Sequence, residues 1–160
     1  MQKITTFLTY DGQAEEAAEL YTSVFENARI LDTSHYTEAG PHEPGSVMTV
    51  TFEIEGQQFI ALNAEGFSFA QGISLMVNCE TQDEVDELWE KLSEGGEKGP
   101  CGWLTDKFGV SWQIVPRVLG DLIADPDREK AGRVMSAMLG MRKIEIAGLE
   151  EAARGAPVAQ

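Results

Sequence analysis

The sequence predicts an α+β fold made of two tandem βαβββ modules followed by C-terminal helices. Three observations lead to this prediction: a strand–helix pattern occurs twice, a strand–turn–strand pattern occurs twice, and the end of the chain has helical periodicity. A chain of 160 residues has room for one domain of this kind. We expect residues 1–117 to form that domain, with modules at about 1–66 and 72–117, and residues 118–160 to form a helical extension.

The strand–helix pattern relates residues 4–25 to residues 72–93. In this alignment Phe7 corresponds to Leu75 and Tyr21 to Trp89. Each copy starts with a strand-like run and continues, after a polar turn, into a helix with a single apolar stripe. The stripe residues are Ala17, Leu20, Tyr21 and Val24 in the first copy and Val85, Leu88, Trp89 and Leu92 in the second. Thr81 followed by Glu84 is typical of a capping box at the start of the second helix.

The strand–turn–strand pattern relates residues 51–62 to residues 104–115. Gly56 and Gly109 occupy equivalent positions between two strand-like runs, which is the usual place for a hairpin turn. The first copy has a longer connection before its hairpin. Because residues 36–46 of that connection are rich in Gly and Pro, we expect them to form an exposed loop.

The end of the chain has the pattern of two helices, at roughly 127–141 and 143–154. Apolar residues gather on one face of the first: Val134, Met135, Met138, Leu139 and Met141. Two interpretations remain open for this face. It packs on the core, or it forms a dimer contact, for which the adaptable Met side chain is well suited.

Composition excludes several kinds of partner. The chain has 12 Lys and Arg against 27 Asp and Glu, a formal charge of −15, so it would repel nucleic acids and anionic membranes. It has no run of about 18 apolar residues that could span a membrane. The first residues lack the apolar region of a secretion signal, and two cysteines make no disulfide framework. We therefore expect a cytoplasmic protein with reduced thiols.

Several segments closely resemble one known family. They are "FLTYDGQAEEAAELY", "FEIEGQQFIALN", "ISLMVNCETQDEVDELWEKL", "CGWLTDKFGVSWQIVP" and "KAGRVMSAMLGMRKIEIAGLEEA", which together cover most of residues 4–153. They resemble the PhnB-like family of the vicinal oxygen chelate superfamily, which includes glyoxalase I, extradiol dioxygenases and bleomycin-resistance proteins. Members often carry the label 3-demethylubiquinone-9 3-methyltransferase. One departure is Asn63-Ala64-Glu65-Gly66, where the family commonly has N-G-G-P; it adds an acidic residue.

The resemblance implies curved sheets that form a cup, in which superfamily enzymes hold a divalent metal with His and carboxylate ligands. The corresponding positions here fall near Ile4–Thr6, near Ile60–Ala61, at Gly72 and at Gln113. Gln113 stands where the superfamily usually supplies Glu, and a neutral amide is a weak ligand. We therefore expect no metal of the superfamily type. An unorthodox site built from His42, Glu65 and Gln113 remains an alternative.

The methyltransferase label has little support in the residues. Binding S-adenosylmethionine usually requires a Gly-rich turn between a strand and a helix in a parallel sheet. The one Gly cluster, at 94–99, follows a helix and is typical of a helix stop. We therefore expect no cofactor. The two histidines, His35 and His42, lie in or near the loop region and are expected to be solvated. For His42 an alternative is that it overhangs the mouth of a pocket together with Glu43.

Four residues are candidates for lining the cup: Cys101, Trp103, Gln113 and Asn63. Alternation along a strand over 111–115 would place Gln113 and Trp112 on opposite faces. The resemblance implies that the face of Gln113 is the one toward the cup, which puts Trp112 in the core. Cys101, near Lys98 and Lys107, is the better candidate for a reactive thiol, although a packing role is the simpler interpretation for it and for Cys79.

Three functions are compatible with these patterns. The first is a metal-free protein that binds a small, mostly apolar or aromatic molecule in the cup. The alternative is an enzyme acting on a small, aromatic or quinone-like metabolite, and the third is a structural or regulatory interaction protein. The resemblance also implies a homodimer.

Overall fold

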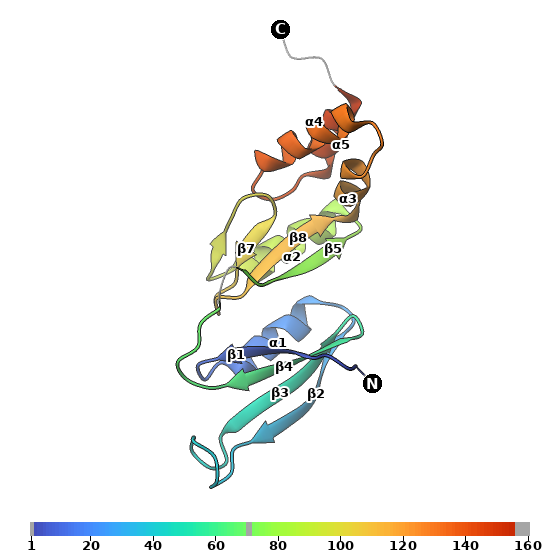
Figure 1. The fold of residues 1–160 in the computed structure, drawn as a ribbon. Helices are drawn as coiled ribbons and strands as arrows, with labels where there is room; N and C mark the ends of the chain where they lie inside the picture. Colours follow the sequence, from blue (N-terminus) through green and yellow to red (C-terminus); the bar gives the residue numbers. More distant parts are fainter. Residues whose placement is uncertain (1, 70–71, 156–160) are drawn as a thin grey trace. The chain divides into compact units, whose positions relative to one another are not determined.

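The computed structural model describes residues 2–69 and 72–155, and the chain divides into two compact units, Met1–Ala70 and Gln71–Gln160. Each unit contains one four-stranded sheet with helices, and each sheet belongs to a βαβββ module (Figure 1). The predicted α+β class and the two modules are confirmed. That the two modules form one domain stays a prediction.

Unit 1 is built on a sheet with the strand order β1-β4-β3-β2, in which β1 runs parallel to β4 and the other neighbours are antiparallel. Helix α1 lies along one face of this sheet (Figure 1). Its small buried residues and Tyr21 face apolar strand residues such as Phe52 and Ala61. The elements are β1 (Thr6–Tyr10), α1 (Ala14–Val24), β2 (Ala28–His35), β3 (Val47–Ile54) and β4 (Gln57–Asn63).

Unit 2 begins with a sheet of the same design, in the order β5-β8-β7-β6. The predicted apolar stripe of α2 is fully buried, and Trp112 and Ile114 of β8 are buried with it. The elements are β5 (Ser74–Cys79), α2 (Gln82–Ser93), β6 (Glu97–Lys98), β7 (Trp103–Thr105) and β8 (Ser111–Pro116).

The predicted turns and caps are in place. Glu55 and Gly56 both have positive φ, 49° and 82°, as a two-residue type I′ hairpin turn requires. Gly109, at φ 95°, lies in the turn that leads into β8. Thr81 Oγ1 accepts a hydrogen bond from the Glu84 backbone N at 3.2 Å, and the Glu84 carboxylate accepts one from Glu80 N. The predicted Thr81 cap is therefore confirmed, whereas the Glu84 carboxylate binds the backbone of the residue before the cap and not that of Thr81 itself.

The repeat alignment needs one correction, in the first strand of each module. Phe59 pairs with Thr6, whereas its counterpart Trp112 pairs with Leu75. Leu75 therefore corresponds to Thr6 and not to Phe7. Side-chain exposure agrees, because Phe7 is 54% exposed and its true counterpart, Met76, is 55% exposed. The helices keep the predicted alignment, so the connection between strand and helix is one residue longer in the first module.

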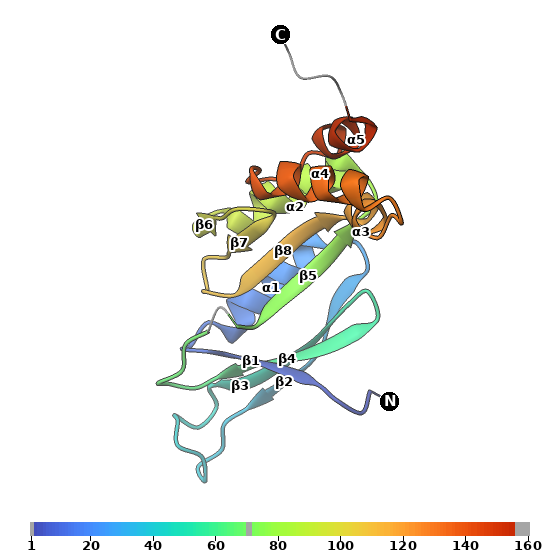
Figure 2. The ribbon, with the colours of Figure 1, turned by 45° about the horizontal axis from the view of Figure 1, so that its top comes forward.

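Three helices follow β8: α3 (Arg117–Ile123), α4 (Arg128–Leu139) and α5 (Ile146–Arg154). They gather beyond the ends of β5 and β8 (Figure 2). The two predicted helices are confirmed, with somewhat shorter limits, and α3 is an addition. A small core joins the three helices: Leu119, Val134, Ile144 and Leu149, with Met138 and Met141 packed against it.

The apolar face predicted on the first tail helix is thus divided. Val134, Met138 and Met141 pack into this core, which agrees with the interpretation that the face packs on the core. Met135 and Leu139 stay 37% and 60% exposed. A dimer contact through these two residues stays a prediction.

No helix within residues 2–69 and 72–155 is long and apolar enough to cross a membrane. The longest, α2 and α4, have 12 residues each. A membrane-spanning helix needs about 20.

Candidate functional site

Three of the four predicted site residues meet in one pocket of unit 2. Cys101, Trp103 and Gln113 all line a hollow of about 300 Å³ against α3, which we call the α3 pocket. Its other lining residues are Met76, Asn78, Val115, Pro116, Arg117, Leu119, Gly120, Ile123 and Met138. The pocket is mostly apolar with a few polar groups, the usual composition of a site for a small molecule.

The sheet register brings Gln113 to this pocket. Trp112 and Ile114 are buried in the core, so Gln113 between them projects from the opposite face of the sheet. On that face Gln113 lies between its cross-strand partners Met76 of β5 and Trp103 of β7. The predicted alternation is confirmed, and three adjacent strands supply one row of pocket residues.

A tight turn places Cys101 beside Trp103. Cys101 and Gly102 both have positive φ, 56° and 84°. Cys101 N donates to Met141 O at 2.8 Å and Gly102 N to Arg142 O at 2.7 Å, so the segment after α4 fixes the turn. A side chain at Gly102 would collide with Ile114 O and with Ile144, both 2.8 Å from an ideal Cβ. Glycine is therefore required at this position.

Two polar groups of the pocket have defined partners. Gln113 Nε2 donates to Ser74 Oγ at 2.9 Å, which orients the amide along the sheet. Arg117 Nε donates to Glu80 Oε1 at 2.6 Å, and both of these side chains are well exposed. A guanidinium has five N–H donors, so Arg117 keeps donors for an acceptor at the pocket.

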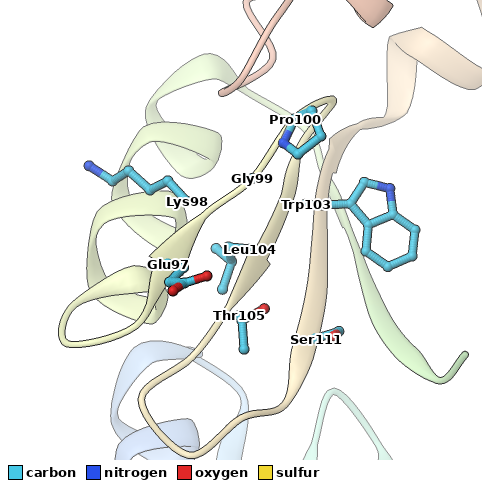
Figure 3. A pocket seen from close by; sticks show the side chains of 8 residues that line it. All are labelled: Glu97, Lys98, Gly99, Pro100, Trp103, Leu104, Thr105 and Ser111. Carbon is cyan, nitrogen blue, oxygen red and sulfur yellow. The ribbon is translucent and has the colours of Figure 1, made fainter. Parts of the chain in front are cut away.

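Trp103 also lines a second hollow, of about 460 Å³, next to the short edge strand β6 (Figure 3). Trp103 and Leu104 project to opposite sides of β7 there. The Lys98 ammonium in this hollow is engaged with the Glu90 carboxylate at 2.9 Å. The remaining lining residues are Glu97, Gly99, Pro100, Thr105 and Ser111. Of the four predicted site residues, Trp103 lines this hollow and the other three do not. The α3 pocket is therefore the better candidate site.

The fourth predicted residue, Asn63, lies in unit 1 and has a structural role there. Its Oδ1 accepts a hydrogen bond from Ala14 N at 2.8 Å, and its Nδ2 donates to Val47 O and to the Glu15 carboxylate. Gln13, the residue before α1, makes no capping bond with its side chain. Asn63 therefore caps α1 from the end of β4.

Asn63 also borders a hollow of about 460 Å³ within unit 1. His42 and Glu65, two members of the unorthodox metal site, line this hollow, whereas Gln113 belongs to unit 2. His42 is half-buried, with its ring centroid 4.6 Å from that of Tyr36, so the alternative of a place at a pocket describes it better than full solvation does. His35, at the end of β2, is exposed as expected.

The two cysteines differ in accessibility. Cys79 is fully buried at the end of β5. Burial, together with the carboxylates of Glu84 and Glu80, raises the pKa of its thiol from 9.0 to about 12. Cys101 is partly exposed in the pocket wall, with Sγ 3.8 Å from Leu139 O. Of the two, Cys101 is the thiol that reagents can reach.

The residues present do not suit the metal of the superfamily. Residues 2–69 and 72–155 contain no group of three His, Cys, Asp or Glu side chains arranged to hold a metal ion. Of the corresponding positions, Gln113 donates its amide to Ser74, Ile60 and Ala61 have hydrocarbon side chains, Gly72 has no side chain, and 4–6 offer only the hydroxyl groups of two threonines. A divalent cation needs several N, O or S donors, which these positions do not supply.

Sequence reasoning missed the wall that α3 contributes. Leu119, Gly120 and Ile123 line the pocket from a helix of seven residues, too short to show a clear helical period. It also missed Asp106. This buried carboxylate organises the turn before β8, and the stretch "TDKFG" with its Asp and Gly held the only signal of that role.

Comparison with known families now identifies the group to which the chain belongs. A family model described as 3-demethylubiquinone-9 3-methyltransferase matches residues 2–115. The chain belongs to this family. The match ends before α3, so the late segment that we compared with the family lies outside it. No curated protein matches the chain.

Solved structures agree with the family and the fold. A PhnB protein from Bacillus cereus, titled a putative 3-demethylubiquinone-9 3-methyltransferase, is 41% identical, with a TM-score of 0.65; the alignment covers 72% of this chain and 99% of that one. Protein PA1353 from Pseudomonas aeruginosa is 19% identical (TM-score 0.62, 72% and 98% covered). FosX from Listeria monocytogenes, a fosfomycin resistance protein solved with Mn(II) and sulfate, is 18% identical (TM-score 0.52, 71% and 92% covered). The family member described here thus has the vicinal oxygen chelate fold.

Proposed function

We propose that this family member binds a small, mostly apolar or aromatic molecule in the α3 pocket without a metal. One observation carries the proposal: the fold gathers Cys101, Trp103 and Gln113 from two strands and a turn around a hollow of about 300 Å³. This volume is at the lower end of the range for small-molecule sites. The ligand that fits is therefore about the size of a single substituted ring.

The chemistry of the wall supports an aromatic ligand with a polar substituent. Trp103 offers an indole surface for stacking or edge contact. Gln113 donates one N–H to Ser74, and its amide can form further hydrogen bonds with a hydroxyl or carbonyl group of the ligand. Arg117 and Asn78 add hydrogen-bonding groups to the same wall. Apolar side chains such as Met76 and Met138 make up most of the remainder.

Metal independence is supported by the donor chemistry of this chain. FosX is described with Mn(II), but a likeness at 18% identity carries the fold alone. Here the amide of Gln113 stands at the position where the resemblance led us to expect a carboxylate. We expect purified protein to retain its ligand affinity after treatment with a chelator.

An enzyme acting on a small metabolite is the alternative, and the family description favours it. Methyl transfer from S-adenosylmethionine lacks support, since neither sheet has the series of parallel strands, with a Gly-rich turn between strand and helix, that commonly binds this cofactor. Incubation of the protein with para-cresol or a dimethoxy-methyl hydroquinone, with and without S-adenosylmethionine, would reveal turnover as a change of product mass.

The binding proposal is tested by titration with para-cresol and with a dimethoxy-methyl hydroquinone, followed by calorimetry and by tryptophan fluorescence. We expect Trp103→Ala to abolish most of the binding, and Gln113→Leu to weaken it about fivefold, the effect of losing one hydrogen bond. Gln57→Leu is the matched control, because Gln57 is an exposed glutamine at the start of β4. Unchanged affinity in both pocket variants would refute the site.

We also propose a homodimer, as the family resemblance implies. Met135 and Leu139, the exposed part of the α4 apolar face, are suited to such a contact. Sedimentation equilibrium of the native protein and of the Leu139→Glu variant tests both statements. A monomer in both cases would refute the proposal, and an unchanged dimer in the variant would exclude this face.

A further inference from the structure

We propose that Gly120 of α3 sets the size of the molecule that the α3 pocket admits. The inference rests on the proposed function and names the residue that controls access to that site. It concerns a part of the chain that the family match does not reach, since the match ends at residue 115.

The helices after β8 supply one wall of the pocket. The residues concerned are Arg117, Leu119, Gly120 and Ile123 of α3 and Met138 of α4. The Bacillus cereus PhnB protein is matched over 99% of its length by only 72% of this chain. A pocket bounded by α3 is thus a feature of this chain beyond what the family match describes.

Within this wall, Gly120 is unusual because nothing in its own surroundings requires glycine. It lies inside a helix, where glycine is less favourable than every residue except proline. Its backbone is not in the left-handed region. A Cβ at this position would meet no atom within 4 Å, so close packing does not exclude a side chain either.

Because Gly120 has no side chain, the space beside it remains part of the pocket. Gly120 is exposed and lines the hollow that Trp103 and Gln113 border, on the helix face that it shares with Ile123, three residues on. A larger residue on this face would therefore take up part of a volume of only about 300 Å³. Glycine at this position therefore keeps the pocket wide enough for a ring, at some expense of helix stability.

Gly132 of α4 provides a matched control. It too lies inside a helix, is exposed, and has no atom within 4 Å of an added Cβ, but it does not line the α3 pocket. Gly148 of α5 is unsuitable, because its Cβ would lie 2.7 Å from the Met141 methyl group. A substitution at Gly132 therefore reports the general effect of a side chain on a helix of this extension.

Cys101 allows the pocket to be measured without a known ligand. It lines the pocket, whereas Cys79 is fully buried and its pKa of about 12 keeps the thiol protonated. Alkylation of the native protein by iodoacetamide, a small reagent, and by pyrenylmaleimide, a large one, therefore reports on Cys101. The Cys101→Ser variant verifies this assignment.

We expect Gly120→Leu to slow the pyrenylmaleimide reaction about tenfold relative to Gly132→Leu, and to change the iodoacetamide rate less than about twofold. Gly120→Ala, which favours the helix, should fold well and give an intermediate slowing of the large reagent. Equal rates in the Gly120 and Gly132 variants, or equal slowing of both reagents, would overturn the inference.

The two proposals fail separately. If para-cresol binds the native protein and binds Gly120→Leu just as tightly, the size limit is wrong and the binding site stands. If Gly120→Leu excludes the large reagent but none of the aromatic molecules binds, the size limit stands and the proposed function is wrong.

Discussion

At the scale of single residues, Asp106 organises the conformation of the stretch "CGWLTDKFGVSWQIVP". Its buried carboxylate accepts hydrogen bonds from Phe108 N at 2.9 Å, from Val110 N at 3.0 Å and from Trp112 Nε1 at 2.9 Å. One side chain thus shapes the turn and fixes a core tryptophan. Because Trp112 is fixed in the core, Gln113 next to it must face the pocket.

We expect Asp106→Ala to lower the free energy of unfolding by about 3 kcal/mol, because three donors lose a charged acceptor in a buried place. Asp106→Asn should cost less, since an amide oxygen can still serve the two backbone donors. Urea unfolding followed by tryptophan fluorescence measures both variants. Asp121→Ala, at an exposed acid of α3, serves as the control and should change stability by less than about 0.5 kcal/mol. Equal losses in the Ala and Asn variants would contradict this role.

The residue scale also shows what sequence could and could not predict about the site. Alternation along β8 was enough to assign opposite faces to Trp112 and Gln113. The role of Asn63 could not be predicted, because its partners Ala14 and Val47 are far away in the sequence. A hydrogen bond between distant segments leaves no local pattern.

At the scale of secondary structure, two helices are capped by side chains from other elements. Asn63 Oδ1 accepts from Ala14 N at the start of α1, and Gln82 Oε1 accepts from Ile146 N at the start of α5, at 2.7 Å. In both helices the residue at the N-cap position makes no capping bond with its own side chain. The capping bond therefore also ties two elements together, α1 to β4 and α5 to α2.

Gln82 makes this attachment stronger by donating to Ile144 O at 3.0 Å. We expect Gln82→Ala to destabilise the docking of α5 by about 1–2 kcal/mol, the combined effect of a lost cap and a lost hydrogen bond. Hydrogen exchange should then become faster at the α5 amides than at those of α2. The control is Gln57→Ala, at an exposed glutamine outside unit 2. Equal acceleration in α2 and α5 would show that the whole unit is weakened instead.

Helices with a clear period of apolar residues could be predicted from the sequence, and the short helix α3 could not. The stripe of α2 and the turns at Gly56 and Gly109 were found because each has a local signature. The stripe of α1 was found in part: Ala17 and Tyr21 are buried as predicted, but Ala14 and Ala18 are buried with them, while Leu20 and Val24 are only partly buried. Helix α3 has only seven residues and follows β8 directly. Its position in the pocket wall depends on tertiary packing of Leu119, which periodicity cannot reveal.

At the scale of the whole molecule, charge is the dominant property. The formal charge of −15 implies mutual repulsion in the folded state, while ion pairs such as Lys143–Asp86 are partly exposed and worth little individually. We expect the unfolding temperature to rise by a few degrees when NaCl is increased from about 0.01 M to about 0.1 M, which shortens the screening length from about 30 Å to about 10 Å.

The control for this measurement is pH. Near the isoelectric point, which the sequence places at about 4.4, net repulsion vanishes and the stabilising effect of salt should vanish with it. A salt effect of the same size at both pH values would contradict the electrostatic explanation. A decrease of stability with salt at neutral pH would show that the ion pairs outweigh the repulsion.

The fold as a whole could be predicted because the chain repeats itself. In each copy alone the pattern of apolar residues is a weak signal of secondary structure. The signal becomes strong where both copies have an apolar residue at the same position, as with Tyr21 and Trp89, which are both buried. The repeat carried no information about residues that occur once. The helical extension occurs once, so it had to be predicted from periodicity alone, and α3 was not predicted.

The register difference between the modules also matters for recombining them. Three residues connect Tyr10 to Ala14, and two connect Cys79 to Gln82. An α-helix turns by roughly 100° per residue, so a helix grafted with the wrong connection would present its apolar stripe about a quarter turn away from the sheet. A chimera that exchanges α1 and α2 should therefore exchange the preceding connections as well. The two copies therefore differ in the length of the connection between the first strand and the helix, and this length sets which side of the helix faces the sheet.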